Sequence, residues 1–300
     1  VASPLIVRVP GGLLEDGMGL HVYGAPSFAE GQRALLFLRS QTDGTYRVLH
    51  LLLGAFHLVE HEGQSLALRR LSAAEEISIP GRARPADGPR DLERFRAWLE
   101  DRGRGADRVA DYFVDAGVDL TAALSKFTIL TGSGRQIRWR IFDTGGSATF
   151  RAHRDGQPGL AGGGFGQFQT ALAAWRNDAA TPIVYNYAGT TGATGGLTNF
   201  DNVNAILFDD PNNNDSFDDP FSCASGGTVA IGGPWYDTNA PHSHNGETFN
   251  TALGGDIVTN KGIDCVRNGA SWISQLRRAD EVFAHELGHI KHRDTLTMTI

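Results

Sequence analysis

Short apolar segments with alternating polar positions fill the first 79 residues of the chain. Glycine, proline and Asp-Gly pairs separate them, and Asp43-Gly44 is typical of the turn of a β-hairpin. The segments are Leu5–Val9, Leu20–Tyr23, Ala34–Leu38, Tyr46–Leu49 and Ala55–Val59. Residues 1–79 are therefore predicted to form a small β domain.

The pattern changes over residues 80–126, which are predicted to form a linker and a helical segment. Proline and glycine dominate Pro80–Pro89, which is typical of a linker. Asp91 is suited to cap a helix, because an apolar stripe at helical spacing follows it. The stripe consists of Leu92, Phe95 and Leu99. A second helical stretch is expected over residues 106–116.

Strands and helices mix from residue 127 onward. A helix is predicted over Gly164–Asn177, because four large apolar residues fall on one of its faces. They are Phe165, Phe168, Leu172 and Trp175. The predicted strands are Ile137–Phe142, Ile183–Tyr187, Asn204–Phe208, Thr228–Ile231 and Asp256–Thr259. The predicted fold class is α+β: the small β domain is followed, over residues 127–300, by a mixed sheet with a backing helix and a final helix from about Ser271.

The final helix carries an HExxH pattern, in which His285 and His289 flank Glu286. Residues four apart lie one turn above each other on a helix, so the two imidazoles can bind one zinc ion. Glu286 can reach a water on that ion and take its proton. Apolar residues at helical spacing favour the helix; they are Val282, Phe283, Leu287 and Ile290. The pattern therefore predicts a catalytic zinc site, and a surface helix with two ordinary histidines is the alternative.

The composition argues against two classes of partner. The chain of 300 residues has 41% hydrophobic residues, enough to bury a core, and a net charge of −7, which argues against a nucleic-acid partner. It contains no run of eighteen apolar residues, so no membrane span is predicted. Val1 opens the chain without a methionine or a signal-like segment, so we expect the sequence to begin within a longer protein.

Cys223 and Cys265 are the only cysteines. An even count fits one disulfide bond in an exported protein, so we expect this bond and a secreted or extracytoplasmic location. Two unpaired thiols are the alternative. A zinc role is disfavoured, because neither cysteine belongs to a CxxC pair.

Three segments carry a family resemblance: Gln169–Trp175, Gly254–Asn260 and Asp280–His289. They are similar to the first long helix, the Gly-Gly-Asp strand and the metal helix of metzincins, and of matrixins most, and the resemblance covers about residues 127–289. It implies a metzincin-like mixed sheet, a zinc-dependent endopeptidase and an edge strand that pairs with an extended peptide substrate. Thr228–Trp235 is the candidate for that edge strand.

The sequence after His289 departs from the metzincin pattern. Metzincins place a glycine three residues later and a third histidine six residues later, where this chain has His292 and Thr295. Residues 284–298 instead resemble the metal helix of integral-membrane gluzincins of the heat-shock and CAAX-prenyl protease type, whose third ligand is a glutamate far downstream. Both resemblances stay open, and we expect the catalytic domain to be truncated at Ile300.

The third zinc ligand is not evident from the sequence. Asp294 is a candidate, although on a straight helix it lies about 140° around the axis from His289. A helix that ends after His289 would make Asp294 the ligand to expect. His292 shares the face of His285 but lies about two turns away, too far for the same ion. His242-Ser-His244 lies in a predicted loop that could fold over the site.

Five aspartates and three asparagines fill the segment Asp209–Asp219. Calcium prefers clustered oxygen ligands, and Asp210, Asn212 and Asn214 alternate as in a cation-binding loop. An EF-hand is excluded, because its sixth position is Asp215 rather than glycine. An irregular calcium loop and a solvated turn remain as alternatives.

Two functions of different classes fit these observations. The leading one is a zinc-dependent endopeptidase that hydrolyses peptide or protein substrates with Glu286 as general base. The alternative is a non-catalytic binding or adhesion protein that carries an incomplete peptidase domain, which the missing third ligand favours.

Overall fold

The structure, a computed structural model, describes residues 4–61, 63–69, 88–114, 131–132, 134–178, 181–213, 217, 219–222, 227–263 and 279–291. These residues form two compact units. The first unit contains the described residues of Val1–Val9, Gly24–Glu76 and Gly81–Phe127, and the second contains those of Pro10–Tyr23 and Thr128–Ile300. Several sheets and few helices make up both units, which confirms the predicted α+β class.

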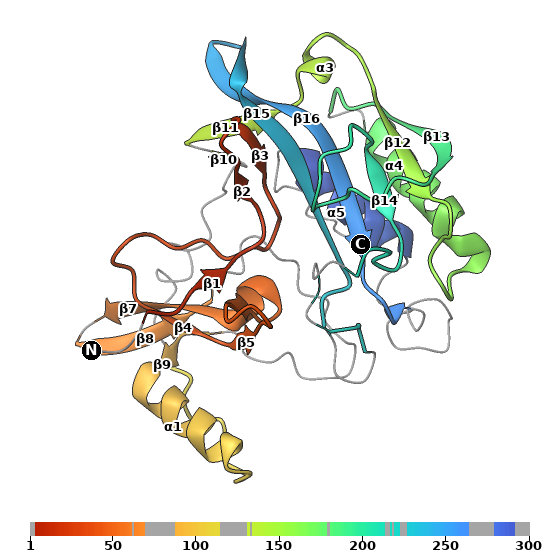
Figure 1. Cartoon of the computed structure of the whole chain (residues 1–300). Helices are drawn as coiled ribbons and strands as arrows, with labels where there is room; N and C mark the ends of the chain where they lie inside the picture. The colour runs from red at the N-terminus through yellow and green to blue at the C-terminus, as the bar shows by residue number, and fades with distance from the viewer. Residues whose placement is uncertain are drawn as a thin grey trace. The chain divides into compact units, whose positions relative to one another are not determined.

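Two small sheets make up most of the first unit (Figure 1). Their orders are β1-β6-β5 and β4-β7-β8-β9. The strands are β1 (Val7–Arg8), β4 (Ala34–Leu36), β5 (Leu38–Ser40), β6 (Tyr46–Val48), β7 (Ala55–His61), β8 (Gln64–Leu68) and β9 (Arg90–Asp91), with a 3-10 turn, η1, at Leu51–Gly54. The turn predicted at Asp43-Gly44 is confirmed, because β5 and β6 pair antiparallel on either side of it.

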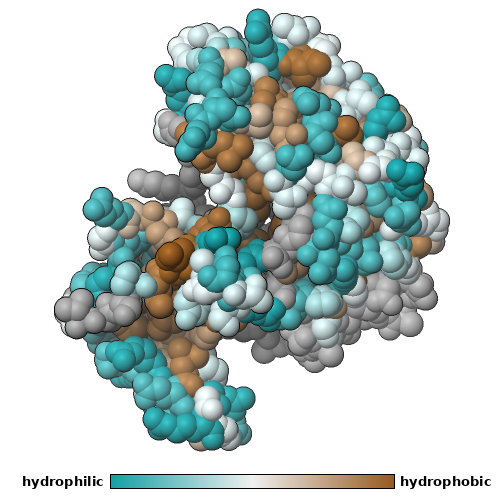
Figure 2. All heavy atoms as spheres, in the orientation of Figure 1, coloured by the Kyte–Doolittle hydropathy of each residue, from teal (hydrophilic) through white to brown (hydrophobic). Residues whose placement is uncertain are grey.

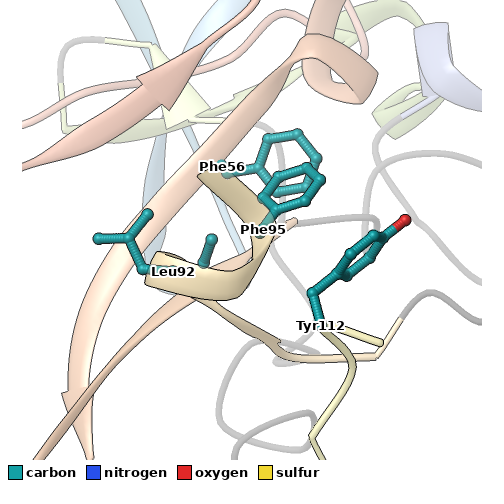
Figure 3. Close-up of a cluster of buried hydrophobic side chains, with 5 residues drawn as sticks. Phe56, Leu92, Phe95 and Tyr112 are labelled. Atoms are coloured by element: carbon teal, nitrogen blue, oxygen red, sulfur yellow. The ribbon is translucent and has the colours of Figure 1, made fainter. Parts of the chain in front are cut away.

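Helix α1 (Leu92–Gly103) confirms the predicted cap and apolar stripe. The Asp91 carboxylate accepts a hydrogen bond from the Arg94 N–H at 2.9 Å, which satisfies a donor of the first turn. The Phe95 ring contacts the tilted rings of Phe56 and Tyr112, with centroids 5.1 and 4.8 Å away (Figure 3). The opposite side of α1 is hydrophilic, as its teal surface at the lower left shows (Figure 2).

The prediction of a second helix over residues 106–116 is wrong for the described residues 106–114, which are not helical. Tyr112 joins the aromatic cluster of α1, and its carbonyl accepts a hydrogen bond from the Asp91 N–H at 2.8 Å. The Trp98 indole donates to the Arg108 carbonyl at 3.1 Å. These tertiary contacts hold the segment extended and override its helical pattern.

A nine-stranded mixed sheet dominates the second unit. Its main path runs β13-β12-β14-β16-β15-β3-β2, and β11 joins β16 and β10 from beside this path. The strands are β2 (Gly12–Leu13), β3 (Met18–Leu20), β10 (Thr131–Gly132), β11 (Arg135–Arg138), β12 (Ala148–His153), β13 (Tyr185–Thr191), β14 (Ala205–Leu207), β15 (Ala230–His244) and β16 (Glu247–Thr259). Strands β12, β13, β14 and β16 pair in parallel, whereas β15 is antiparallel to β16.

Helices α4 (Phe165–Arg176) and α5 (Ala279–Lys291) pack together behind this sheet (Figure 1). The backing helix predicted over Gly164–Asn177 is confirmed, and Phe168, Leu172 and Trp175 are buried as its pattern predicts. Phe168 contacts Phe150 of β12 and Phe283 of α5, each with ring centroids 6.3 Å apart. The core of this unit therefore lies between the sheet and the two helices.

Two predicted boundaries differ from the structure. The strand predicted over Ile137–Phe142 ends at Arg138, and a short helix α3 (Arg140–Asp143) follows. Trp139 and Phe142 are both buried, which a helical spacing of three allows. The sequence analysis placed residues 10–23 in the small β domain of residues 1–79. In the structure they belong to the second unit, because β3 pairs with β15.

None of the helices in the described part of the chain has the length and apolar character that a bilayer span requires.

Candidate metal centre

Helix α5 carries the HExxH pattern and is held by the core on its apolar side. Phe283 and Leu287 are fully buried, as the apolar spacing predicts, and the Phe283 ring lies 5.9 Å from that of Phe208. The Trp175 indole of α4 donates a hydrogen bond of 2.7 Å to the Ala284 carbonyl. The residue before His285 is thereby fixed to the neighbouring helix.

Glu286 is buried between α5 and β15, with 7% of its surface exposed. A methyl group added at Gly232 of β15 would lie 3.2 Å from the Glu286 Oε2 atom and 3.3 Å from its main-chain oxygen. The absence of a side chain at Gly232 therefore lets the strand and the carboxylate approach closely.

His285 and His289 lie one helical turn apart in α5, although their side chains are outside the described part of the structure. The helix is continuous through both residues and reaches Lys291. Two imidazoles at this spacing with a carboxylate next to the first are a donor set that fits zinc. The residue types and their spacing on α5 are therefore those that a zinc site needs, and zinc binding remains a prediction.

The loop predicted around His242 and His244, from which they could fold over the site, is wrong. Both residues lie in β15, where they pair with Phe249 and Glu247 of β16. β15 bulges between Asp237 and His242, so the separation is counted on β16. There the partners of Gly232 and His242, Ile257 and Phe249, are eight residues apart, which corresponds to about 25 Å. These histidines are therefore too far from Glu286 to supply the third ligand.

His242 and His244 instead surround Asp143, each with a ring nitrogen 3.3 Å from one of its carboxylate oxygens. The Arg138 guanidinium also contacts this carboxylate, at 2.7 Å from its Nε atom. Burial lowers the pKa of His242. The cluster therefore joins the end of the β15-β16 hairpin to Asp143 of α3 and Arg138 of β11.

The other candidate ligands lie outside the described residues or do not form a group within them. Asp294 and His292 follow the last described residue, so Asp294 remains a prediction. Within the residues that the structure describes, no group of His, Cys, Asp or Glu side chains is arranged to hold a metal ion, the cluster of Asp143, His242 and His244 included.

The candidate calcium loop is described only in part. Asp210 is buried, and its N–H donates to the Thr259 carbonyl at 2.9 Å. Asn212 donates to the Thr194 carbonyl, and the Lys261 ammonium donates to Asn213 Oδ1 at 2.9 Å. Asn214 lies outside the description, so the calcium site remains a prediction.

The prediction that Thr228–Trp235 is a free edge strand is wrong for Gly232–Trp235. These residues belong to β15, which pairs with β16 on one side. On the other side β3 pairs with Trp235, and the N–H groups of His21 and Tyr23 donate to Pro234 and Gly232 at 3.1 Å. Both edges of β15 are therefore occupied at the level of Glu286.

Asp256, in the Gly-Gly-Asp segment of β16, supports the sheet from within. It is 3% exposed, and its carboxylate accepts a hydrogen bond of 2.9 Å from the Ala205 N–H of β14. Burial raises the pKa of this carboxyl well above its ordinary value. The burial and the bond to β14 indicate a structural role in joining the two strands.

Sequence reasoning missed the contacts that place Glu286. Gly232 and Gly233 were visible as two glycines within a strand pattern, which signals close approach by another segment. The bond from Trp175 to Ala284 joins positions 109 residues apart and leaves no local signal.

Cys223 and Cys265 both lie outside the described residues. We expect them to form a disulfide bond that closes a loop of about forty residues, worth roughly 3–4 kcal/mol of stability when unstrained. Mass spectrometry of the alkylated, non-reduced protein checks this prediction. Two alkylated thiols in the native protein would contradict both the bond and the exported location.

Comparisons of the chain with protein-family models, with curated proteins and with solved structures find no match. Function is therefore inferred from the residues of α5 and their surroundings.

Proposed function

We propose that this protein is a secreted zinc-dependent endopeptidase. The observation that carries the proposal is the HExxH sequence on a continuous helix whose glutamate is buried against a strand. A general base needs this kind of fixed position next to its substrate.

The order of elements supports the proposed metzincin-like arrangement. Strand β12 is followed by α4, by strands β13 to β16 and then by α5. This is the order strand, helix, several strands and HExxH helix on which the resemblance rests. The Gly-Gly-Asp segment lies in β16, the last strand before α5, which also agrees with it.

In this proposal His285 and His289 hold zinc, and Glu286 acts on the water. Zinc, when bound, polarises the scissile carbonyl and lowers the pKa of its water. Glu286 accepts the proton of that water and later donates it to the leaving amine. Its position against Gly232 fixes the direction from which the carboxylate acts.

The test of this function measures zinc content and peptide hydrolysis in the same preparation. We expect zinc to copurify with the protein, and removal by a chelator to abolish hydrolysis of a casein or mixed-peptide substrate until zinc is returned. His289→Ala should lose zinc. Protein that folds but holds no zinc and cleaves nothing would favour the alternative, a binding or adhesion protein.

The third ligand is tested by two substitutions beyond the described end of α5. We propose Asp294 for this role, which requires that the helix, continuous to Lys291, does not extend through Asp294. In that case Asp294→Ala should weaken zinc binding, measured by competition with a chromogenic chelator. His292→Ala is the matched control, because that residue follows Lys291 directly and lies about two turns from His285 along the line of α5. Unchanged zinc affinity in Asp294→Ala would remove Asp294 from the site.

A further inference from the structure

A pocket opens in the second unit beside α3, which lies at the end of the sheet drawn uppermost in Figure 1. Its volume is about 510 Å³. Pockets that bind small ligands usually measure about 300–1,000 Å³. The wall is built by α3 with its flanking residues, by the start of β12, by the residue before β14 and by β16. Strands and a short helix of one unit therefore enclose a space of ligand size.

The pocket is separate from the candidate metal centre. Ala252 of its wall pairs with Tyr236, which lies four residues along β15 from Gly232, or about 13 Å. Thr149 of β12 also lines the pocket, whereas the next residue, Phe150, contacts α4 on the other face of the sheet. A ligand in this pocket therefore does not compete for the space around Glu286.

Aliphatic side chains form part of the wall. Ile141 of α3 and Leu253 of β16 both line the pocket, and they remain 42% and 38% exposed. A bound apolar group would remove part of this surface from water, which favours binding. The wall therefore suits a ligand with an apolar side chain.

Arg140 supplies the positive charge of the described residues that line the pocket. Its side chain is exposed, and no hydrogen bond or ion pair joins its guanidinium to another described residue. Asp143, three residues later in α3, contacts the Arg138 guanidinium at 2.7 Å instead. Arg140 is therefore available to an anionic group of a ligand. Its single charge matches a carboxylate, which arginine binds through two parallel hydrogen bonds.

Hydroxyl groups add hydrogen-bonding capacity to the wall. The Ser147 hydroxyl accepts a hydrogen bond of 2.9 Å from the Asn186 amide, so its own proton can be donated to a ligand carbonyl. The Thr144 hydroxyl donates to the Ile141 carbonyl at 3.1 Å, so its oxygen can accept from a ligand N–H. Both groups match the two polar atoms of a peptide bond.

The described lining residues include no aspartate or glutamate. A free amino acid would therefore bring its ammonium group into the pocket without a carboxylate to pair with it. The last residue of a peptide carries a carboxylate and a side chain, but its nitrogen is an uncharged amide. The charge of the wall thus favours a peptide end over a free amino acid.

We propose that this pocket binds the C-terminal residue of a peptide that ends in an apolar side chain and a free carboxylate. The carboxylate pairs with Arg140, the side chain contacts Ile141 and Leu253, and the hydroxyls of Thr144 and Ser147 bind the preceding peptide group. The inference concerns binding alone and does not depend on the proposed peptidase activity.

The test compares acetyl-alanyl-leucine with its C-terminal amide, which differs only in the lost charge. Dissociation constants are measured by ligand-observed NMR titration of the full chain carrying Glu286→Gln, so that no probe is hydrolysed. We expect the acid to bind about tenfold or more tightly than the amide, because only the acid can form the charge-assisted pair. Acetyl-alanyl-glycine should bind more weakly than acetyl-alanyl-leucine, because it has no apolar side chain.

Arg140→Gln locates the binding in the pocket. It should lower the affinity for the acid about tenfold and leave the affinity for the amide unchanged. Arg140 is exposed, so the substitution removes no buried contact. Arg135→Gln is the matched control, because Arg135 of β11 is also exposed but does not line the pocket. The control should keep both affinities.

Each contrary result overturns a stated part of the inference. Equal binding of acid and amide would reject recognition of the carboxylate, and acid binding that survives Arg140→Gln would reject the pocket as its site. Tighter, Arg140-dependent binding of octanoate would assign the pocket to fatty carboxylates instead of peptide ends. No saturable binding of any probe would reject the site altogether. Hydrolysis by the chain with Glu286 is measured separately, so none of these results bears on the peptidase.

Discussion

Replacing Glu286 with glutamine is expected to lower peptide hydrolysis by about 10²–10⁴-fold while zinc stays bound. Glutamine has the size of glutamate, so it fits the space against Gly232, but its amide cannot accept the proton of the water. The measurement compares turnover and zinc content of the two proteins. The zinc content matters because it separates a lost base from a lost metal.

Glu247→Gln provides the matched control for this substitution. Glu247 is exposed at the turn of the β15-β16 hairpin, far along the strand from Gly232. It undergoes the same chemical change and should keep full activity. Hydrolysis by Glu286→Gln at the rate of this control would remove Glu286 from the mechanism.

Phe283→Ala is expected to lower the free energy of unfolding of the second unit by about 3–5 kcal/mol. Phe283 is fully buried and contacts the rings of Phe168 in α4 and Phe208, the residue after β14, so its loss leaves a cavity beside these two rings. Helix α5 depends on this packing, and zinc affinity should fall together with stability. Urea unfolding and a zinc titration measure the two effects.

The control for Phe283→Ala is Leu253→Ala, in the same unit. Leu253 of β16 is 38% exposed, so its truncation removes less buried apolar surface and leaves no enclosed cavity. We expect its cost to be well below that of Phe283→Ala. Equal costs for the two substitutions would mean that α5 is not anchored through Phe283.

Helices were predictable from the sequence where neighbouring residues supply both a suitable helix start and an apolar stripe that the structure buries. Asp91 and the stripe after it give α1, and the aromatic face from Phe165 to Trp175 gives α4. The prediction failed over residues 106–114, where contacts with distant residues compete with the local helical pattern. Tyr112 left its helical pattern because the cluster around Phe95 binds its ring in an extended segment.

Strand lengths were less predictable than strand positions. Thr228–Ile231 and Asp256–Thr259 marked only the first and last parts of a hairpin formed by β15 and β16. Pro234 and the glycines beside it interrupt the apolar alternation that predicts a strand. Their hydrogen bonds to neighbouring strands maintain the extended chain where the side-chain pattern gives no signal.

By itself the sequence determined the chemistry of the candidate site, because His285, Glu286 and His289 lie within five residues and one helix brings them together. Only the tertiary structure decided what surrounds that site. Residues 16–23 pair with β15, which lies more than 200 residues further along the chain, as in the hydrogen bond from Thr238 to Gly17. Strand pairing uses main-chain N–H and C=O groups, which nearly every residue carries. A side-chain pattern therefore does not predict which distant segment pairs with β15.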